Sequence, residues 1–206
     1  VYAVVAGPRE AAETAVQHGA RRALWAQPPS GDTLVEDIVP TLEALVREHQ
    51  PALVLVGATR RGRVVAGRLA ARLDTTALTD VQEISAAGEG FQIRHLIFGG
   101  GAVRVERLQA ATVVATAGPG VFNARAPQPG AAGEVVSVPF TPPQPGAVLR
   151  ERRPRAGAVT NLSAAKRVVC PGRGVAKEED LEMIRALGQA LSAEIGCTRP
   201  LAEGLN

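Results

Sequence analysis

The chain has 206 residues, of which 46% are hydrophobic, so it can bury one large core or two small ones. Its net charge of +3 comes without a basic helix or basic residues interleaved with aromatics, which argues against nucleic-acid binding. No apolar run reaches the length of about 18 residues that a membrane span needs. Two cysteines far apart in the sequence are typical of a reduced, cytoplasmic protein.

The first third of the chain alternates Val-rich runs with Ala/Leu segments of helical spacing, which favours an α/β fold. Strands are predicted at residues 1–6, 22–26 and 52–56, and helices at 9–17 and 62–73. The run at 52–56 is apolar throughout, so we expect a parallel strand that is buried on both faces, away from the sheet edge. These elements predict a doubly wound parallel sheet with helices on both faces.

After Leu73 the pattern changes to strands without helices between them. Residues 78–85 and 91–98 predict a hairpin excursion from the parallel sheet, and the three glycines at 99–101 are expected to shape a turn or bulge rather than to touch a ligand. Two further strands are predicted at 111–117 and 134–138. The first domain is therefore predicted to span residues 1–140.

The segment 141–160 is rich in Pro, Gly and Arg and has no periodicity, so it is predicted to be a linker. A second α/β domain begins at residue 161 with a strand at 166–170, a helix at 178–191 and a short strand at 193–196. The segment from residue 161 to residue 206 is too short for a complete doubly wound sheet, so we expect only the beginning of that domain.

Two turns of this second domain combine glycine or threonine with arginine at the ends of predicted parallel strands. The first contains Gly172, Arg173 and Gly174, and the second contains Thr198 and Arg199. Such turns open helices at the edge of the sheet where α/β proteins hold pyrophosphates. Glycine lets the backbone approach a ligand, and arginine neutralises phosphate charge. These residues are predicted to form a cofactor site.

The rest of the chain offers weaker signals. A turn at 57–63 carries three arginines between a strand and a helix, and it could bind an anion or be an ordinary β–α turn; its spacing fits neither Walker A nor a dinucleotide fingerprint. The histidines at 18, 49 and 95 have no metal-ligand neighbours, and Asp80 and Glu83 form no convincing acid/base pair. We predict no nucleophile and no metal site.

The order of these segments resembles the alpha subunit of electron-transfer flavoproteins. The resemblance is carried by residues 53–63, by 79–81, by the Gly-Gly-containing segment 94–102 and by the two arginine turns at 168–174 and 196–203. It covers nearly the whole chain, and residues 59–62, 106–107 and 197–200 look closest to the branch associated with carnitine metabolism and nitrogen fixation.

The resemblance implies a first domain of the adenine nucleotide alpha-hydrolase-like fold that packs against a beta subunit, and a second domain that binds FAD. It implies an electron carrier rather than a stand-alone enzyme, taking electrons from an acyl-CoA or other dehydrogenase, as in fatty acid beta-oxidation, to a quinone oxidoreductase or another acceptor. AMP or a second FAD would belong to the beta subunit. The alternative is a nucleotide-binding regulatory module of the same fold without flavin.

On the family pattern, Arg173 is expected near the FAD pyrophosphate, and Thr198 and Arg199 beside the cofactor, with Arg199 near the isoalloxazine. A cation there would stabilise the anionic reduced flavin and raise its potential. The family's first strand and helix would precede Val1, and its later FAD-contacting segments would follow Asn206. We therefore expect the FAD site of these 206 residues to be incomplete.

Overall fold

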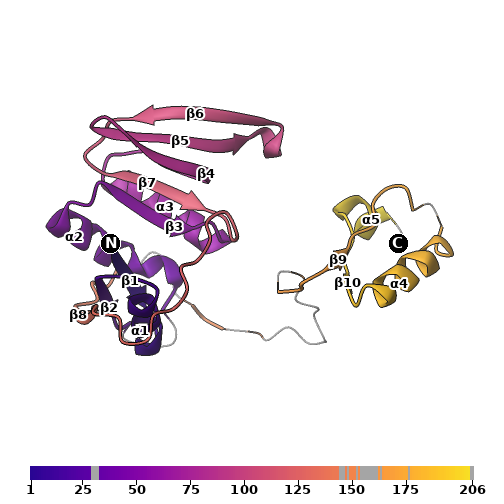
Figure 1. Cartoon of the computed structure of the whole chain (residues 1–206), viewed down its shortest axis with the longest axis horizontal. Coiled ribbons are helices and arrows are strands. Elements are labelled where there is room, and N and C mark those ends of the chain that lie inside the picture. The colour runs from indigo at the N-terminus through magenta and orange to yellow at the C-terminus, as the bar shows by residue number, and fades with distance from the viewer. Residues whose placement is uncertain are drawn as a thin grey trace. The chain divides into compact units, whose positions relative to one another are not determined.

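A computed structural model describes residues 1–28, 33–143, 147, 149–151, 153, 162, 164–175 and 177–204. The chain divides into two compact units, Val1–Arg150 and Glu151–Asn206 (Figure 1). The boundary falls within the predicted linker, most of which lies outside the described residues. Each unit is described by itself below.

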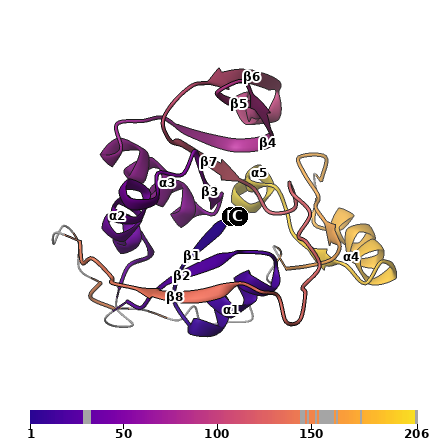
Figure 2. The ribbon, with the colours of Figure 1, turned by 60° about the vertical axis from the view of Figure 1, so that its left-hand side comes forward.

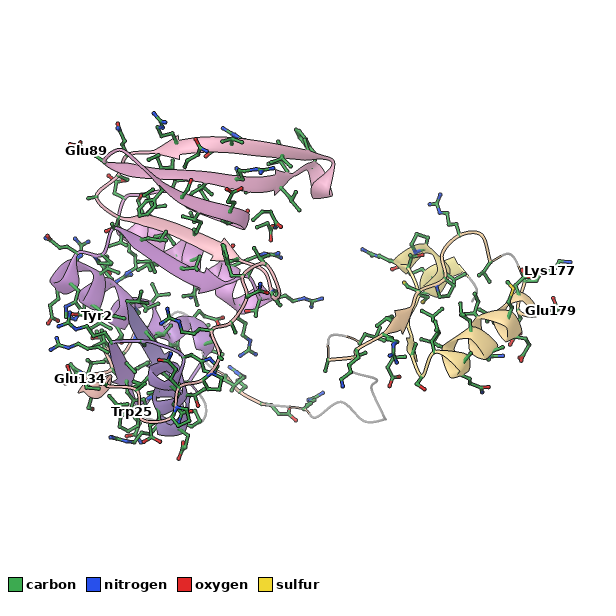
Figure 3. The ribbon with its side chains drawn as sticks, viewed as in Figure 1. Tyr2, Trp25, Glu89, Glu134, Lys177 and Glu179 are labelled. Atoms are coloured by element: carbon green, nitrogen blue, oxygen red, sulfur yellow. The ribbon has the colours of Figure 1, made fainter. Side chains whose placement is uncertain are left out.

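The first unit begins with a three-stranded parallel sheet. Its strands are β1 (Tyr2–Ala6), β2 (Arg22–Ala26) and β8 (Glu134–Val138), in the order β1-β2-β8. Helix α1 (Arg9–Gln17) joins β1 to β2 and packs Ala12 and Val16 against one face. The single tryptophan, Trp25, lies on β2 in this sheet (Figure 3) and donates a hydrogen bond to Gly7 O.

A five-stranded mixed sheet forms the rest of the unit, in the order β3-β7-β4-β5-β6. Strands β3 (Leu53–Gly57), β7 (Val113–Ala117) and the start of β4 (Ala77–Ala87) are parallel. From β4 the chain turns back into the antiparallel strands β5 (Gly90–Ile97) and β6 (Ala102–Leu108), which are the predicted excursion. The 3₁₀ segment η2 (Phe98–Gly100) connects them, with positive φ at Gly99 and Gly100.

Two helices join the sheets into one unit. A 3₁₀ segment η1 (Val35–Ile38) leads into α2 (Val39–His49), with Pro40 in the first turn of α2, where a proline is tolerated. Helix α3 (Arg60–Arg72) follows β3. One buried cluster unites Leu69 of α3 and Val39 with Ala26 of β2 and Val114 of β7, so α2 and α3 cover both sheets.

The predicted α/β class with a strand excursion is confirmed, but the predicted interior position of the strand at 52–56 is wrong. The parallel strands are divided between two sheets, and β3 lies at an edge of its sheet, with Leu55 49% exposed. In the five-stranded sheet, α3 packs against Val114 of β7, and a second buried cluster joins Val113 and Ala115 of β7 to Leu78, Val81 and Ile93 of the neighbouring strands β4 and β5.

The second unit has a minimal α/β pattern. Strands β9 (Val168–Val169) and β10 (Glu194–Ile195) pair in parallel, and α4 (Asp180–Ala190) connects them. Helix α5 (Arg199–Gly204) follows β10. Lys177 and Glu179 mark the approach to α4 (Figure 3). Among the described residues, no helix of either unit is long and apolar enough to cross a membrane.

Candidate functional site

The two arginine turns lie next to each other in the second unit. Beyond the paired strands, the Gly196 N–H donates to Val169 O at 3.0 Å, and the Thr198 N–H donates to Pro171 O at 3.1 Å. The ladder of hydrogen bonds thus continues past β9 and β10, and it ties the two turns together at the carboxyl edge of the strands. The structure brings the two predicted site segments together, as their sequence positions suggested.

Gly172 and Thr198 occupy facing positions in these turns. A Cβ at Gly172 would lie 3.7 Å from Oγ1 of Thr198, an ordinary contact distance. Gly174 has open space around it, with nothing within 4 Å of the position of a Cβ. The glycines therefore leave room above the turn, as the backbone's approach to a ligand requires.

The two arginines differ in their surroundings. Arg173 is exposed at the turn that follows β9. Arg199 begins α5 with its side chain 85% exposed, and its Nε lies 2.7 Å from Oε1 of Glu203. Sequence reasoning missed Glu203 as a partner, although its spacing of four residues could have indicated it. Because both side chains are exposed, this ion pair is weak and can open for an anion.

The turns are held by the helices that follow them. Thr198 O accepts from the N–H groups of Leu201 and Ala202, and Leu201 is buried. Gly188 of α4 lies so close to β10 that a Cβ there would be 3.0 Å from Ile195 Cδ1. The close approach of α4 to β10 fixes the strand from which the second turn emerges.

A hollow in this unit lies at the start of α4, lined by Glu178, Glu179, Glu182 and Arg185. Three carboxylates against one guanidinium disfavour a pyrophosphate in that hollow. None of the predicted site residues lines it. The charge of this hollow therefore makes it a poor site for an anionic cofactor.

The turn between β3 and α3 is explained by its own architecture. Thr59 caps α3, because its Oγ1 accepts the Gly62 N–H at 2.9 Å. Arg63 pairs with Asp80 at 2.6 Å. A Cβ at Gly62 would lie 1.9 Å from Gly57 O, so only glycine fits there. These contacts favour the ordinary β–α turn over an anion site.

The histidines and the triple glycine add no catalytic site in the described part of the chain. His95 is buried on β5, and its Nε2 lies 3.6 Å from Oε1 of Glu106, which also pairs with Arg104. Glu106 is a cross-strand neighbour that only the hairpin register could reveal. The glycines at 99–101 shape the β5–β6 turn, as predicted. No group of three metal-ligating side chains occurs among the described residues.

Comparison with known proteins identifies the family to which the chain belongs. Residues 1–143 match the family described as the electron transfer flavoprotein domain, and residues 161–204 match the electron transfer flavoprotein FAD-binding domain. The two matches cover the two units in the order that the resemblance implied. The chain belongs to the electron transfer flavoprotein family, as an alpha-subunit-like member.

Individual relatives agree with this family. The chain is 34% identical over 171 residues to the electron transfer flavoprotein subunit YdiR of Escherichia coli K12, covering 83% of this chain and 55% of YdiR. It is 30% identical over 173 residues to FixB of Salmonella typhimurium, covering 84% and 55%, and 30% identical over 190 residues to FixB of Escherichia coli 55989, covering 92% and 61%. The chain spans about half the length of the curated relatives it matches.

Proposed function

We propose that this chain is part of an electron-transfer flavoprotein alpha subunit, an electron carrier that works with a beta subunit. The observation that carries the proposal is the junction of the two arginine turns through the Thr198 N–H and Pro171 O, within the segment that matches the FAD-binding domain. That match favours a flavin carrier over a nucleotide-binding regulatory module without flavin.

The residues of the turns fit one end of a dinucleotide. Arg173 would neutralise the pyrophosphate, and the open space at Gly174 admits a phosphate near the backbone. The Thr198 hydroxyl, facing Gly172, can donate a hydrogen bond to the same ligand. When bound, FAD supplies the reversible acceptance of electrons.

Arg199 would set the electrostatics of the cofactor site. Its guanidinium is paired with Glu203, so the cation is partly compensated before a ligand binds. An anionic ligand would compete with Glu203 for the same N–H donors. We propose that Arg199 releases Glu203 when the cofactor binds, and that its positive charge then stabilises negative charge on the flavin.

The partners we propose follow the family. The beta subunit would dock on apolar surface, and the excursion offers one outward face, where Leu96 pairs with Val103 and Val105 lies alongside. Phe98, at the end of β5, is 87% exposed. Electrons would come from an acyl-CoA or other dehydrogenase and go to a quinone oxidoreductase or another acceptor, with AMP or a second FAD in the beta subunit.

FAD retention in the complete heterodimer tests the proposal. Arg173→Ala should lower the FAD content after dialysis by roughly tenfold, since one phosphate-neutralising guanidinium is lost. Arg185→Ala is the matched control, because Arg185 lies on α4 in the same unit and pairs with Glu182. Equal FAD retention in both variants would sink the site assignment, and a complete heterodimer without flavin would sink the function.

A further inference from the structure

Helix α3 concentrates positive charge on one side of the first unit. It contains no acidic residue, and it carries five arginines, at positions 60, 61, 63, 68 and 72. The prediction that the chain has no basic helix is therefore wrong. Figure 2 shows α3 beside α2 and β3, and the residues that it buries are all small or apolar. All of its arginines lie on the exposed side.

Two of these arginines are paired with neighbouring elements. Nη2 of Arg63 lies 2.6 Å from Oδ1 of Asp80 on β4, and Nε of Arg72 lies 2.5 Å from Oε2 of Glu43 on α2. At 3.6 residues per turn, Arg63 and Arg72 lie on opposite borders of the exposed side. The pairs therefore occupy the borders of this side and leave its middle to the other arginines.

The three remaining arginines, Arg60, Arg61 and Arg68, form no ion pair with any residue that the structure describes. Arg60 and Arg61 stand in the first turn of α3, which holds no acidic residue. Cations are unfavourable there because the helix dipole already places positive partial charge at the N-terminus. The stability of the unit therefore gives no reason for these charges, whereas an external anion would.

Small residues occupy the middle of the same exposed side. Val64 is 44% exposed, and a Cβ at Gly67 would have no atom within 4 Å. A glycine inside a helix lowers its stability relative to alanine, and no contact in the described part of the chain requires one here. A glycine on an exposed helix face leaves room for another backbone to approach closely.

The spacing of the arginines indicates the size of the anion. Arg60 and Arg68 are separated by about 12 Å along the helix, which is too far for a single phosphate or carboxylate group to reach both. The Gly62 N–H at the end of the helix is already bonded to Thr59, so the charges line a surface rather than a pocket. Acidic side chains on successive turns of a second helix match this length.

Membranes and nucleic acids fit this surface less well. A helix that binds a lipid surface needs several large apolar side chains beside its cations, and α3 exposes one, Val64. The elements that pack beside α3 are acidic, with Glu36 and Asp37 on η1 and Glu48 on α2. A nucleic-acid duplex is wider than one helix, so its phosphates would meet these carboxylates.

We propose that the α3 face, formed by Arg60, Arg61, Val64, Gly67 and Arg68, docks an acidic helix of a partner protein. The partner helix crosses α3 at Gly67, packs on Val64 and presents Asp or Glu side chains to the three arginines. This inference concerns the surface of the first unit and does not rest on the proposed flavin site.

Binding of a synthetic acidic helix tests the proposal. The probe is a fluorescently labelled peptide of about 20 residues, with glutamate along one face and alanine elsewhere, because shorter peptides are only marginally helical. Fluorescence anisotropy at low salt measures its dissociation constant with the 206-residue chain. The same peptide with glutamine in place of glutamate should bind roughly tenfold more weakly or worse.

Removal of the three unpaired charges should weaken peptide binding. The triple variant Arg60→Gln/Arg61→Gln/Arg68→Gln should raise the dissociation constant by roughly tenfold or more, because three ion pairs are lost together. The matched control is Arg21→Gln/Arg107→Gln/Arg150→Gln, which removes three exposed arginines elsewhere in the same unit. It lowers the net charge equally and should change binding by less than about twofold.

A substitution at Gly67 separates close packing from charge. Gly67→Gln fills the open space, so it should weaken peptide binding by roughly fivefold. The same change should raise the folded-to-unfolded ratio of the free chain by roughly threefold, because glutamine is a better helix former than glycine. Trp25 fluorescence in urea measures that ratio, since Trp25 lies on β2 of the same unit. A glycine that served only the fold would show a loss of stability instead.

Four results would overturn the proposal. The first is an absence of peptide binding at low salt. The second is an equal loss of binding in the two triple variants, which would mean that net charge alone attracts the peptide. The third is a Gly67→Gln variant that binds as tightly as the wild type. The fourth is tighter, arginine-dependent binding to a short DNA duplex or to phosphatidylserine vesicles, which would assign the α3 face to nucleic acid or to a membrane.

Discussion

The turn after β3 and the turns after β9 and β10 have the same ingredients but opposite surroundings. Each places glycine and arginine at the end of a parallel strand. In the first unit the ingredients are used internally: Thr59 caps α3, Arg63 pairs with Asp80, and Gly62 touches the Gly57 carbonyl. In the second unit Gly174 faces open space and Arg173 is exposed.

This difference teaches that a glycine–arginine turn becomes a candidate site only where its groups remain available. A donor that already caps a helix cannot also bind a ligand, and a glycine that is pressed against backbone leaves no room for one. Four predictions follow, from the largest expected effect to the smallest. Three of them test whether the first turn is structural and the second functional, and one tests an ion-pair network elsewhere in the first unit.

The sharpest contrast is between two glycine-to-alanine variants. Gly62→Ala should destabilise the first unit by about 2–4 kcal/mol, because the new Cβ would lie 1.9 Å from Gly57 O and the backbone must shift. Gly174→Ala should leave stability within about 0.5 kcal/mol while weakening FAD retention. Urea unfolding followed by Trp25 fluorescence measures the stability of the Gly62→Ala variant. Urea unfolding followed by circular dichroism measures the stability of the Gly174→Ala variant. Equal destabilisation by the two variants would refute the distinction.

Substitution of the threonines should distinguish the two turns in the same way, by its effect on stability in the first turn and on FAD retention in the second. Thr59→Ala should cost about 1 kcal/mol, since the Gly62 N–H loses its cap, whereas Thr59→Ser should retain most of the stability. Thr198→Ala should affect FAD retention in the heterodimer more than stability. A Thr59→Ala variant as stable as the wild type would show that the cap contributes nothing and would reopen this turn as a ligand site.

The first unit is also tied together by a carboxylate between α2 and α3. Arg72 and Arg47 hydrogen-bond to Glu43 and lower its pKa from the usual value of 4.5. Glu43→Gln should therefore cost about 1 kcal/mol at pH 7. Because the folded-state pKa is the lower one, this contribution is present above about pH 4.5 and is lost as the pH falls through the folded-state pKa.

Urea unfolding of the first unit at a series of pH values measures this loss. Glu13→Gln is the control, since Glu13 forms an exposed pair with Arg9 on α1 of the same unit and should change stability little at any pH. A Glu43→Gln variant whose stability differs from the wild type equally at pH 7 and pH 3 would contradict the electrostatic origin of the effect.

The smallest effects on stability should come from the exposed ion pairs. Arg63→Ala and Arg199→Ala should each cost less than about 0.5 kcal/mol, because both pairs are open to solvent. Only Arg199→Ala should also lower the flavin potential in the complete heterodimer, by tens of millivolts, at roughly 60 mV per tenfold change for one electron. Redox titration of FAD-saturated protein decides this, and an unchanged potential would make Arg199 a surface residue.

Much of the fold follows from local patterns. The apolar runs of β1, β2 and β3, the helical spacing of α3 and the loss of helices after Leu73 each predicted the element that the structure contains. Periodicity reports which side of an element is buried, and a turn composition reports where it ends. The two arginine turns were recognisable for the same reason, since their chemistry is contained in short segments.

Other features depend on partners that are distant in the sequence. The positions of β1 and β3 at sheet edges, the pairing of Arg63 with Asp80, and the contact between His95 and Glu106 arise from strand order and hairpin register. Sequence alone determined which segments are strands and helices and which turns contain both arginine and glycine. Only the tertiary structure decided which arginine turn is closed by its own contacts and which stays open, because that depends on residues that folding brings together.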